Sequence, residues 1–69
     1  MSNDDRSKLK TLLSYWVEHN REHAGEFREW AAKARRMGEG EVAGEIAEAV
    51  KNMDRVSEIL TRTLKRLEA

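Results

Sequence analysis

His19 and His23 lie four residues apart and are the only histidines in the 69-residue chain. Side chains four residues apart share one face of a helix, so both imidazoles can reach one metal ion. Glu22 and Glu26 each follow one of these histidines by three residues. Each carboxylate can serve as a further ligand or as the acceptor that orients an imidazole. The spacing therefore predicts a metal site made of His19, His23, Glu22 and Glu26.

The residue types restrict the metal and the role of this site. The chain has no cysteine, so a thiolate cage such as that of a zinc finger is excluded. Imidazole and carboxylate ligands suit divalent transition metals, and we expect Ni, Zn or Co, with Cu also compatible. No Ser-His-Asp arrangement or phosphate-binding glycine loop is present, and a small hairpin lacks an enzyme-sized cleft. We therefore predict storage, delivery or sensing of a metal, and no enzymatic activity.

A second interpretation of the two histidines needs no metal. A histidine on the apolar side of a helix is more often a hydrogen-bonded core residue than a ligand, and His23 has Asn20, Asn52 and Ser57 as potential partners. The chain would then be a helical oligomerisation or protein-interaction module. This alternative predicts that both histidines can be replaced by glutamine with little loss of oligomerisation or of partner binding.

Two helices must position these residues. Apolar residues recur every three or four positions, which is typical of amphipathic helices. Arg35 and Arg36 suit the negative end of a helix, and Gly38 suits the left-handed residue that follows it. Gly38-Glu39-Gly40 is the one strong break in the pattern. We predict a single all-α domain over 1–69, an antiparallel hairpin with a helix over about 4–37, a turn over 38–40 and a helix over about 41–67.

The apolar stripes predict which residues form the core. The first helix carries Leu9, Leu13, Trp16, Asn20, His23, Phe27, Trp30, Ala34 and Met37, widened by Leu12, Val17, Ala24 and Ala31. The second carries Val42, Ile46, Ala49, Met53, Val56, Leu60, Leu64 and Leu67, widened by Val50 and Ile59. These arcs are wider than one neighbouring helix can cover. We therefore expect a homodimer forming a four-helix bundle, or a higher homo-oligomer, with another helical protein as an alternative partner.

Asn20 and the aromatic residues admit two interpretations each. An amide within an apolar stripe acts as a register device, or it orients His23 and contacts an ion. Trp16, Trp30, Phe27 and Tyr15 fill a core, or they exclude water from the histidine site. The first interpretation of each is the more common in proteins.

Charge and hydropathy exclude other classes of protein. Thirteen basic and thirteen acidic residues cancel and are interspersed, whereas a nucleic-acid-binding protein normally has a basic stripe. No apolar run approaches the roughly 18 residues that span a membrane. The sequence begins with polar and acidic residues, unlike a secretory signal. We expect no nucleic acid, no membrane and a cytoplasmic location.

The stretch from Leu12 to Trp30 reads L-L-S-Y-W-V-E-H-N-R-E-H-A-G-E-F-R-E-W. Its pattern, W-x-E-H-N-x-E-H-A-x-x-F-x-x-W, resembles a family of small uncharacterised helical proteins of archaea and anaerobic bacteria. The resemblance covers nearly the whole chain. Some members of that family occur beside or fused to small nickel-binding proteins, so the resemblance implies metal handling. The residues that match the motif are Glu18, His19, Asn20, Glu22 and His23.

Overall fold

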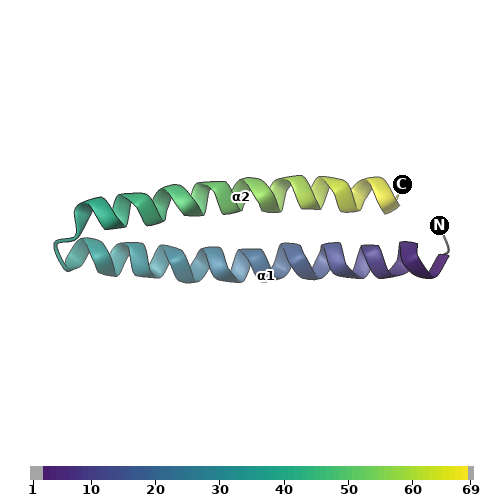
Figure 1. The fold of residues 1–69 in the computed structure, drawn as a ribbon, viewed down its shortest axis with the longest axis horizontal. Helices are drawn as coiled ribbons and strands as arrows, with labels where there is room; N and C mark the ends of the chain where they lie inside the picture. The colour runs from purple at the N-terminus through teal and green to yellow at the C-terminus, as the bar shows by residue number, and fades with distance from the viewer. Residues whose placement is uncertain (1–2, 69) are drawn as a thin grey trace.

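Two long helices make up the protein. The computed structural model describes residues 3–68, which form α1 (Asn3–Arg36) and α2 (Gly40–Glu68). The helices run in opposite directions and lie side by side along their length, so the beginning of α1 lies close to the end of α2 (Figure 1). The hairpin is a rod of 53 × 14 × 14 Å. The predicted all-helical hairpin is confirmed.

The turn is built on Gly38. Its φ is 84°, a left-handed conformation that glycine adopts without strain. The N–H of Glu39 donates to Ala34 O at 2.9 Å and the N–H of Gly38 donates to Arg35 O at 3.1 Å, the two bonds of a Schellman motif. The carbonyl of Glu39 then accepts the first bond of α2, from Ala43 N–H at 2.9 Å. Consequently α1 ends one residue earlier than predicted and α2 begins one residue earlier.

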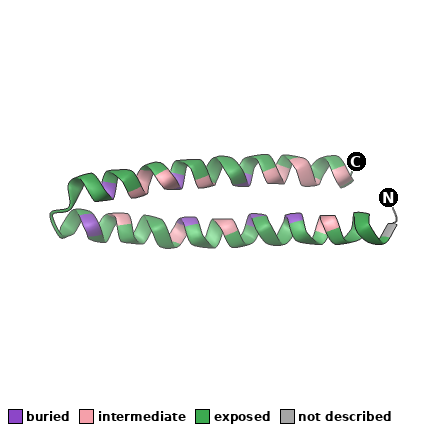
Figure 2. Ribbon diagram, in the orientation of Figure 1, coloured by how far each residue is buried: buried purple, intermediate pink, exposed green. Residues whose placement is uncertain are grey.

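A narrow seam of mostly small side chains joins the helices. Figure 2 shows the buried residues along the line where α1 and α2 meet. Alanine and valine let the two backbones approach closely, and Ala43 is completely inaccessible to solvent. The buried residues are Leu13, Val17, Ala24 and Ala34 of α1 and Ala43, Val50 and Ser57 of α2.

The predicted core stripe of α1 was wrong at alternate positions: Leu13, Asn20 and Ala34 lie at the seam as predicted, whereas the positions between them shift by one residue. The seam is therefore rotated from the predicted stripe by about half a residue, or about 50°. Trp16, His23 and Phe27 are exposed, while Val17 and Ala24, expected only to widen the stripe, lie in the seam. Trp30 is 52% exposed and Met37 72%. A contact between two helices covers one narrow arc of each, so the wide arcs cannot both be buried in a single hairpin.

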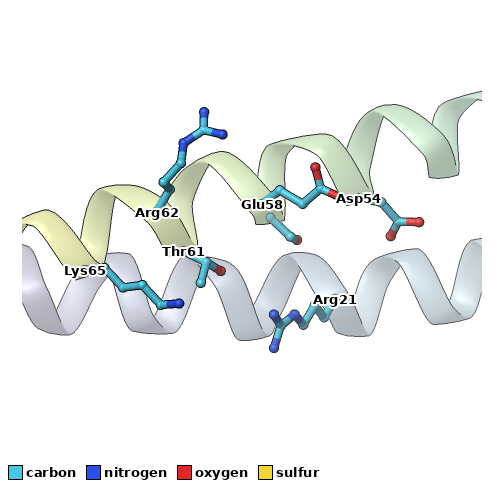
Figure 3. Close-up of a pocket in the computed structure, with 7 residues that line it drawn as sticks. Arg21, Asp54, Glu58, Thr61, Arg62 and Lys65 are labelled. Atoms are coloured by element: carbon cyan, nitrogen blue, oxygen red, sulfur yellow. The ribbon is translucent and has the colours of Figure 1, made fainter.

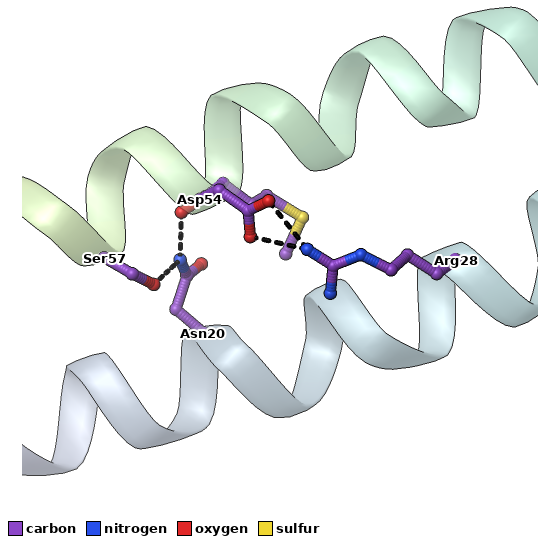
Figure 4. Close-up of polar contacts among 5 residues, drawn as sticks. Asn20, Arg28, Asp54 and Ser57 are labelled. Atoms are coloured by element: carbon purple, nitrogen blue, oxygen red, sulfur yellow. Dashed lines mark hydrogen bonds and ion pairs between the residues drawn. The ribbon is translucent and has the colours of Figure 1, made fainter.

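Asn20 ties the two helices together at the middle of the seam. Its Nδ2 donates to the Met53 carbonyl oxygen at 2.7 Å and to Ser57 Oγ at 2.8 Å (Figure 4). Both partners are on α2, and neither is a histidine. The geometry agrees with the role of register device, because sliding or rotating either helix would break both bonds.

Over residues 3–68, neither helix contains a stretch that is apolar and long enough to cross a lipid bilayer.

Replacing Asn20 with alanine should destabilise the hairpin. Asn20→Ala leaves the buried Ser57 hydroxyl without its partner, so we expect the free energy of unfolding to fall by about 1–3 kcal/mol. Urea denaturation followed by far-UV circular dichroism at fixed protein concentration measures the loss. The double variant Asn20→Ala/Ser57→Ala should lose less than the two single variants added together. Strict additivity would contradict a direct energetic link between the two side chains.

Candidate functional site

The structure brings the two imidazoles into contact. His23 Nε2 lies 3.1 Å from His19 Nε2, and the ring planes are nearly perpendicular at 88°. His19 stacks on Tyr15 with ring centroids 5.3 Å apart, and the His23 ring lies 6.4 Å from that of Phe27. The four rings therefore form a continuous row along α1, and the neighbours on either side limit how the imidazoles can turn.

The separation of the two nitrogens matches that of two ligands on one ion. Nitrogen ligands at 2.0–2.1 Å from a metal and at 90–109° to each other lie about 2.9–3.4 Å apart. The observed 3.1 Å falls inside that range. The distance is therefore compatible with two ligands of one ion, and because it is also a hydrogen-bond distance, binding an ion would replace the hydrogen bond between the rings.

Of the two predicted carboxylates, only Glu26 approaches an imidazole. Glu26 Oε2 lies 3.8 Å from His23 Nδ1, the ring nitrogen that does not face His19. This is the position of a group that orients an imidazole, not of a ligand to the same ion. Glu22 is exposed. Within residues 3–68 no three His, Asp or Glu side chains gather closely enough to hold a metal ion, so the structure does not join Glu22 to the histidines.

The contact between the imidazoles also indicates which nitrogen of each ring carries the proton. One Nε2 must donate the hydrogen bond and the other must accept it, because two protonated nitrogens or two bare ones would repel. The carboxylate of Glu26 favours a proton on Nδ1 of His23. This contact favours Nε2 of His23 as the acceptor and Nε2 of His19 as the donor.

Both histidines lie on a side of the hairpin that exposes large apolar residues. We call this the apolar side and define it by the exposed residues Leu12, Trp16, Phe27 and Trp30 of α1 and Val42, Val56 and Ile59 of α2. His19 and His23 precede the seam residues Asn20 and Ala24, just as Trp16 precedes Val17. The prediction that His23 lies in the core is therefore wrong, and both rings are exposed in the single hairpin.

Residues of the two helices meet across this apolar side. A groove of about 280 Å³ is lined by Phe27 and Trp30 of α1, by Ile46 and Ala49 of α2, and by Glu26. Glu26, which approaches His23, also lines this groove. The histidines and the exposed apolar residues thus form one surface.

The opposite side is polar, and we call it the polar side. A groove of about 510 Å³ on this side is lined mainly by charged and hydroxyl side chains of both helices, including Arg21, Asp54, Glu58, Thr61 and Lys65 (Figure 3). Arg28 donates from Nη2 to both carboxylate oxygens of Asp54 at 2.8 and 2.6 Å (Figure 4). The sequence did not indicate this ion pair, because its partners lie 26 residues apart on different helices. Mixed charges on an open surface are typical of a solvated face.

Comparison with known proteins places the chain among uncharacterised relatives. A domain of unknown function, DUF8180, matches residues 9–67. An uncharacterised protein of Archaeoglobus fulgidus is 39% identical over 57 residues, covering 83% of this chain and 90% of that protein. No solved structure matches the chain. The resemblance to a small uncharacterised family with archaeal members is confirmed at this level.

The hydrogen bond between the imidazoles predicts two different tautomers. In metal-free protein at a pH where both rings are neutral, we expect His23 to carry its proton on Nδ1 and His19 on Nε2, because Glu26 faces Nδ1 of His23. Long-range ¹H–¹⁵N correlation spectra of the side chains distinguish the two forms. Glu26→Gln should weaken the preference at His23. The same tautomer on both rings would contradict the hydrogen bond.

Proposed function

The chain belongs to the DUF8180 family, and we propose that it is a non-catalytic protein that binds a divalent transition-metal ion through His19 and His23. The observation that carries the proposal is the 3.1 Å separation of the two Nε2 atoms. Two imidazoles four residues apart on a helix have many rotamers, and few of them converge on one point. The convergence here supports chelation of one ion.

The surroundings of the pair support the same proposal. Stacking on Tyr15 holds the His19 ring, and Glu26 faces Nδ1 of His23. An acceptor at Nδ1 of His23 leaves its Nε2 available to a metal, and His19 binds through Nε2 once its proton moves to Nδ1. Imidazole nitrogen selects Ni, Zn or Co over the hard cations Mg and Ca. Nickel agrees with the implication of the family resemblance. Storage, delivery or sensing of the ion fits a hairpin without an enclosed cleft.

We further propose that the protein assembles through its apolar side into a four-helix bundle, most simply as a homodimer. Exposed apolar residues of both helices share this side, whereas the other side is charged. Monomeric proteins rarely expose contiguous apolar surface of more than a few hundred Å². A second hairpin packed on this side would bury the tryptophans. It would also cover the part of each helix's apolar arc that a single hairpin leaves exposed.

The metal proposal predicts selective loss of binding in histidine variants. Isothermal titration of untagged, chelator-treated protein with Ni²⁺, Co²⁺ and Zn²⁺ should give a Kd tighter than about 100 μM for at least one of these ions. His19→Gln and His23→Gln should each weaken binding by more than about tenfold, since each removes one of two ligands. Lys51→Gln, an exposed substitution elsewhere on α2, is the matched control and should leave the Kd unchanged. Absence of binding by the wild type, or unchanged binding by His23→Gln, would refute the proposal.

The assembly proposal predicts that a charge on the apolar side opposes association. Trp30→Glu should raise the dissociation constant of the oligomer by more than about tenfold, because a carboxylate would be buried in the interface. Ala32→Glu introduces the same side chain at an exposed position two residues away and should have little effect. Sedimentation velocity over a range of concentrations measures both. A wild type that sediments as a single 8.0 kDa chain at every concentration would refute assembly.

A metal-free module for oligomerisation or protein interaction is the second candidate, and the exposed tryptophans favour it. The two candidates differ in what the histidines contribute. If the protein is only such a module, the variant His19→Gln/His23→Gln retains full self-association or partner binding, and added metal changes neither.

A further inference from the structure

We infer that one metal ion is shared by the histidine pairs of two copies of this chain. In this dimer α1 packs against α1 of the second copy in the opposite direction, with the twofold axis passing between His19 and His23. Metal binding then strengthens the dimer. The inference rests on the proposed function and adds the partner of the site and the arrangement of the helices.

The donor set of one hairpin is incomplete. Two imidazoles converge, and no third carboxylate or imidazole among residues 3–68 joins them. Zinc and cobalt in nitrogen-rich protein sites take about four ligands in tetrahedral geometry. A twofold axis at the pair supplies two more imidazoles of the same geometry. Because the pair is on the exposed apolar side, a second hairpin packed there can reach it.

The sequence of α1 is nearly symmetric about this axis. His19 and His23 lie two residues on either side of position 21, and Leu12 and Trp30 lie nine residues on either side. Trp16 lies five residues before position 21, and Phe27 lies six residues after it. When α1 of the second copy runs in the opposite direction, Leu12 of one copy therefore packs on Trp30 of the other. Trp16 of one copy then packs near Phe27 of the other. The four imidazoles come to lie in the centre of an apolar surface.

The charges of α2 favour the same reversal. One stripe of α2, whose positions recur every three or four residues, carries exposed acidic residues in its first half and exposed arginines in its second: Glu41, Glu45 and Glu48, then Arg55, Arg62 and Arg66. Of these arginines, Arg55 also pairs with Glu58 of its own helix at 3.6 Å. Asn20 bonds Met53 and Ser57, which centre on position 55, so the axis passes near that position of α2. Reversal about this point brings Glu45 of one copy near Arg66 of the other. Such pairs add little affinity but select the orientation of the copies.

The other twofold arrangement leaves the site incomplete. With the axis parallel to the helices, α1 would pack on α2 of the second copy, and the histidines would face the region around Val56. That region of α2 contains no histidine. The two arrangements also differ in where the turns lie: at opposite ends of the bundle in the proposed dimer, and at the same end in the other.

Zinc titration tests the stoichiometry. Isothermal titration of the full chain with Zn²⁺ should give one ion per two chains, and saturating Zn²⁺ should lower the dimer dissociation constant more than about tenfold in sedimentation experiments. His19→Gln/His23→Gln should abolish this effect, and Lys51→Gln should retain it. One ion per chain on a monomer would overturn the inference and leave the proposed function standing. No binding of Zn²⁺, Ni²⁺ or Co²⁺ would overturn both.

A distance measurement tests the arrangement. The chain has no native cysteine, so Glu39→Cys in the turn can carry a single spin label. In the zinc-loaded dimer, double electron–electron resonance should give about 50 Å between the labels, because each turn lies about 17 residues from the axis. Turns at the same end of the bundle would give about 20–30 Å, since helices pack 8–10 Å apart. The short distance would overturn the inference. The labelled protein must bind Zn²⁺ with the same stoichiometry as the wild type.

Discussion

The rotation of α1 about its own axis decides what this hairpin presents to its surroundings. That rotation follows from close packing at the seam, where alanine and valine let the helices approach and Asn20 donates to two acceptors on α2. An amide in an apolar seam is costly without partners, so the rotation that lets Asn20 reach both Met53 and Ser57 is favoured. The seam therefore follows Asn20 and the small residues, and the tryptophans stay outside.

This rotation divides the hairpin into two unlike sides. The polar side carries the Arg28–Asp54 pair and a groove of mixed charges. The apolar side carries Trp16, Trp30 and both histidines. On this side apolar residues and two imidazoles in contact share one surface. The proposed metal-linked dimer accounts for both features with one contact.

The histidine site could be predicted in part. Spacing of four residues places His19 and His23 on the same face whatever the tertiary structure, because the helix alone determines it. The relation between Glu26 and His23 follows from the same local geometry. Glu22 belongs to the same pattern, yet it is not gathered with the imidazoles. Side-chain rotamers, which the spacing does not define, decide which carboxylate approaches a ring.

By itself the sequence determined everything that depends on local interactions. It predicted both helices, the turn at Gly38 and the hairpin, because capping, periodicity and the conformational freedom of glycine act within a few residues. It did not determine which of two adjacent apolar stripes forms the seam. Trp16, His23 and Trp30 gave as good a helical repeat as Val17, Ala24 and Ala31, and only packing against α2 separates the two sets. Cross-helix contacts such as Asn20–Ser57 and Arg28–Asp54 likewise arise from the relative rotation and register of the helices, which no local interaction specifies.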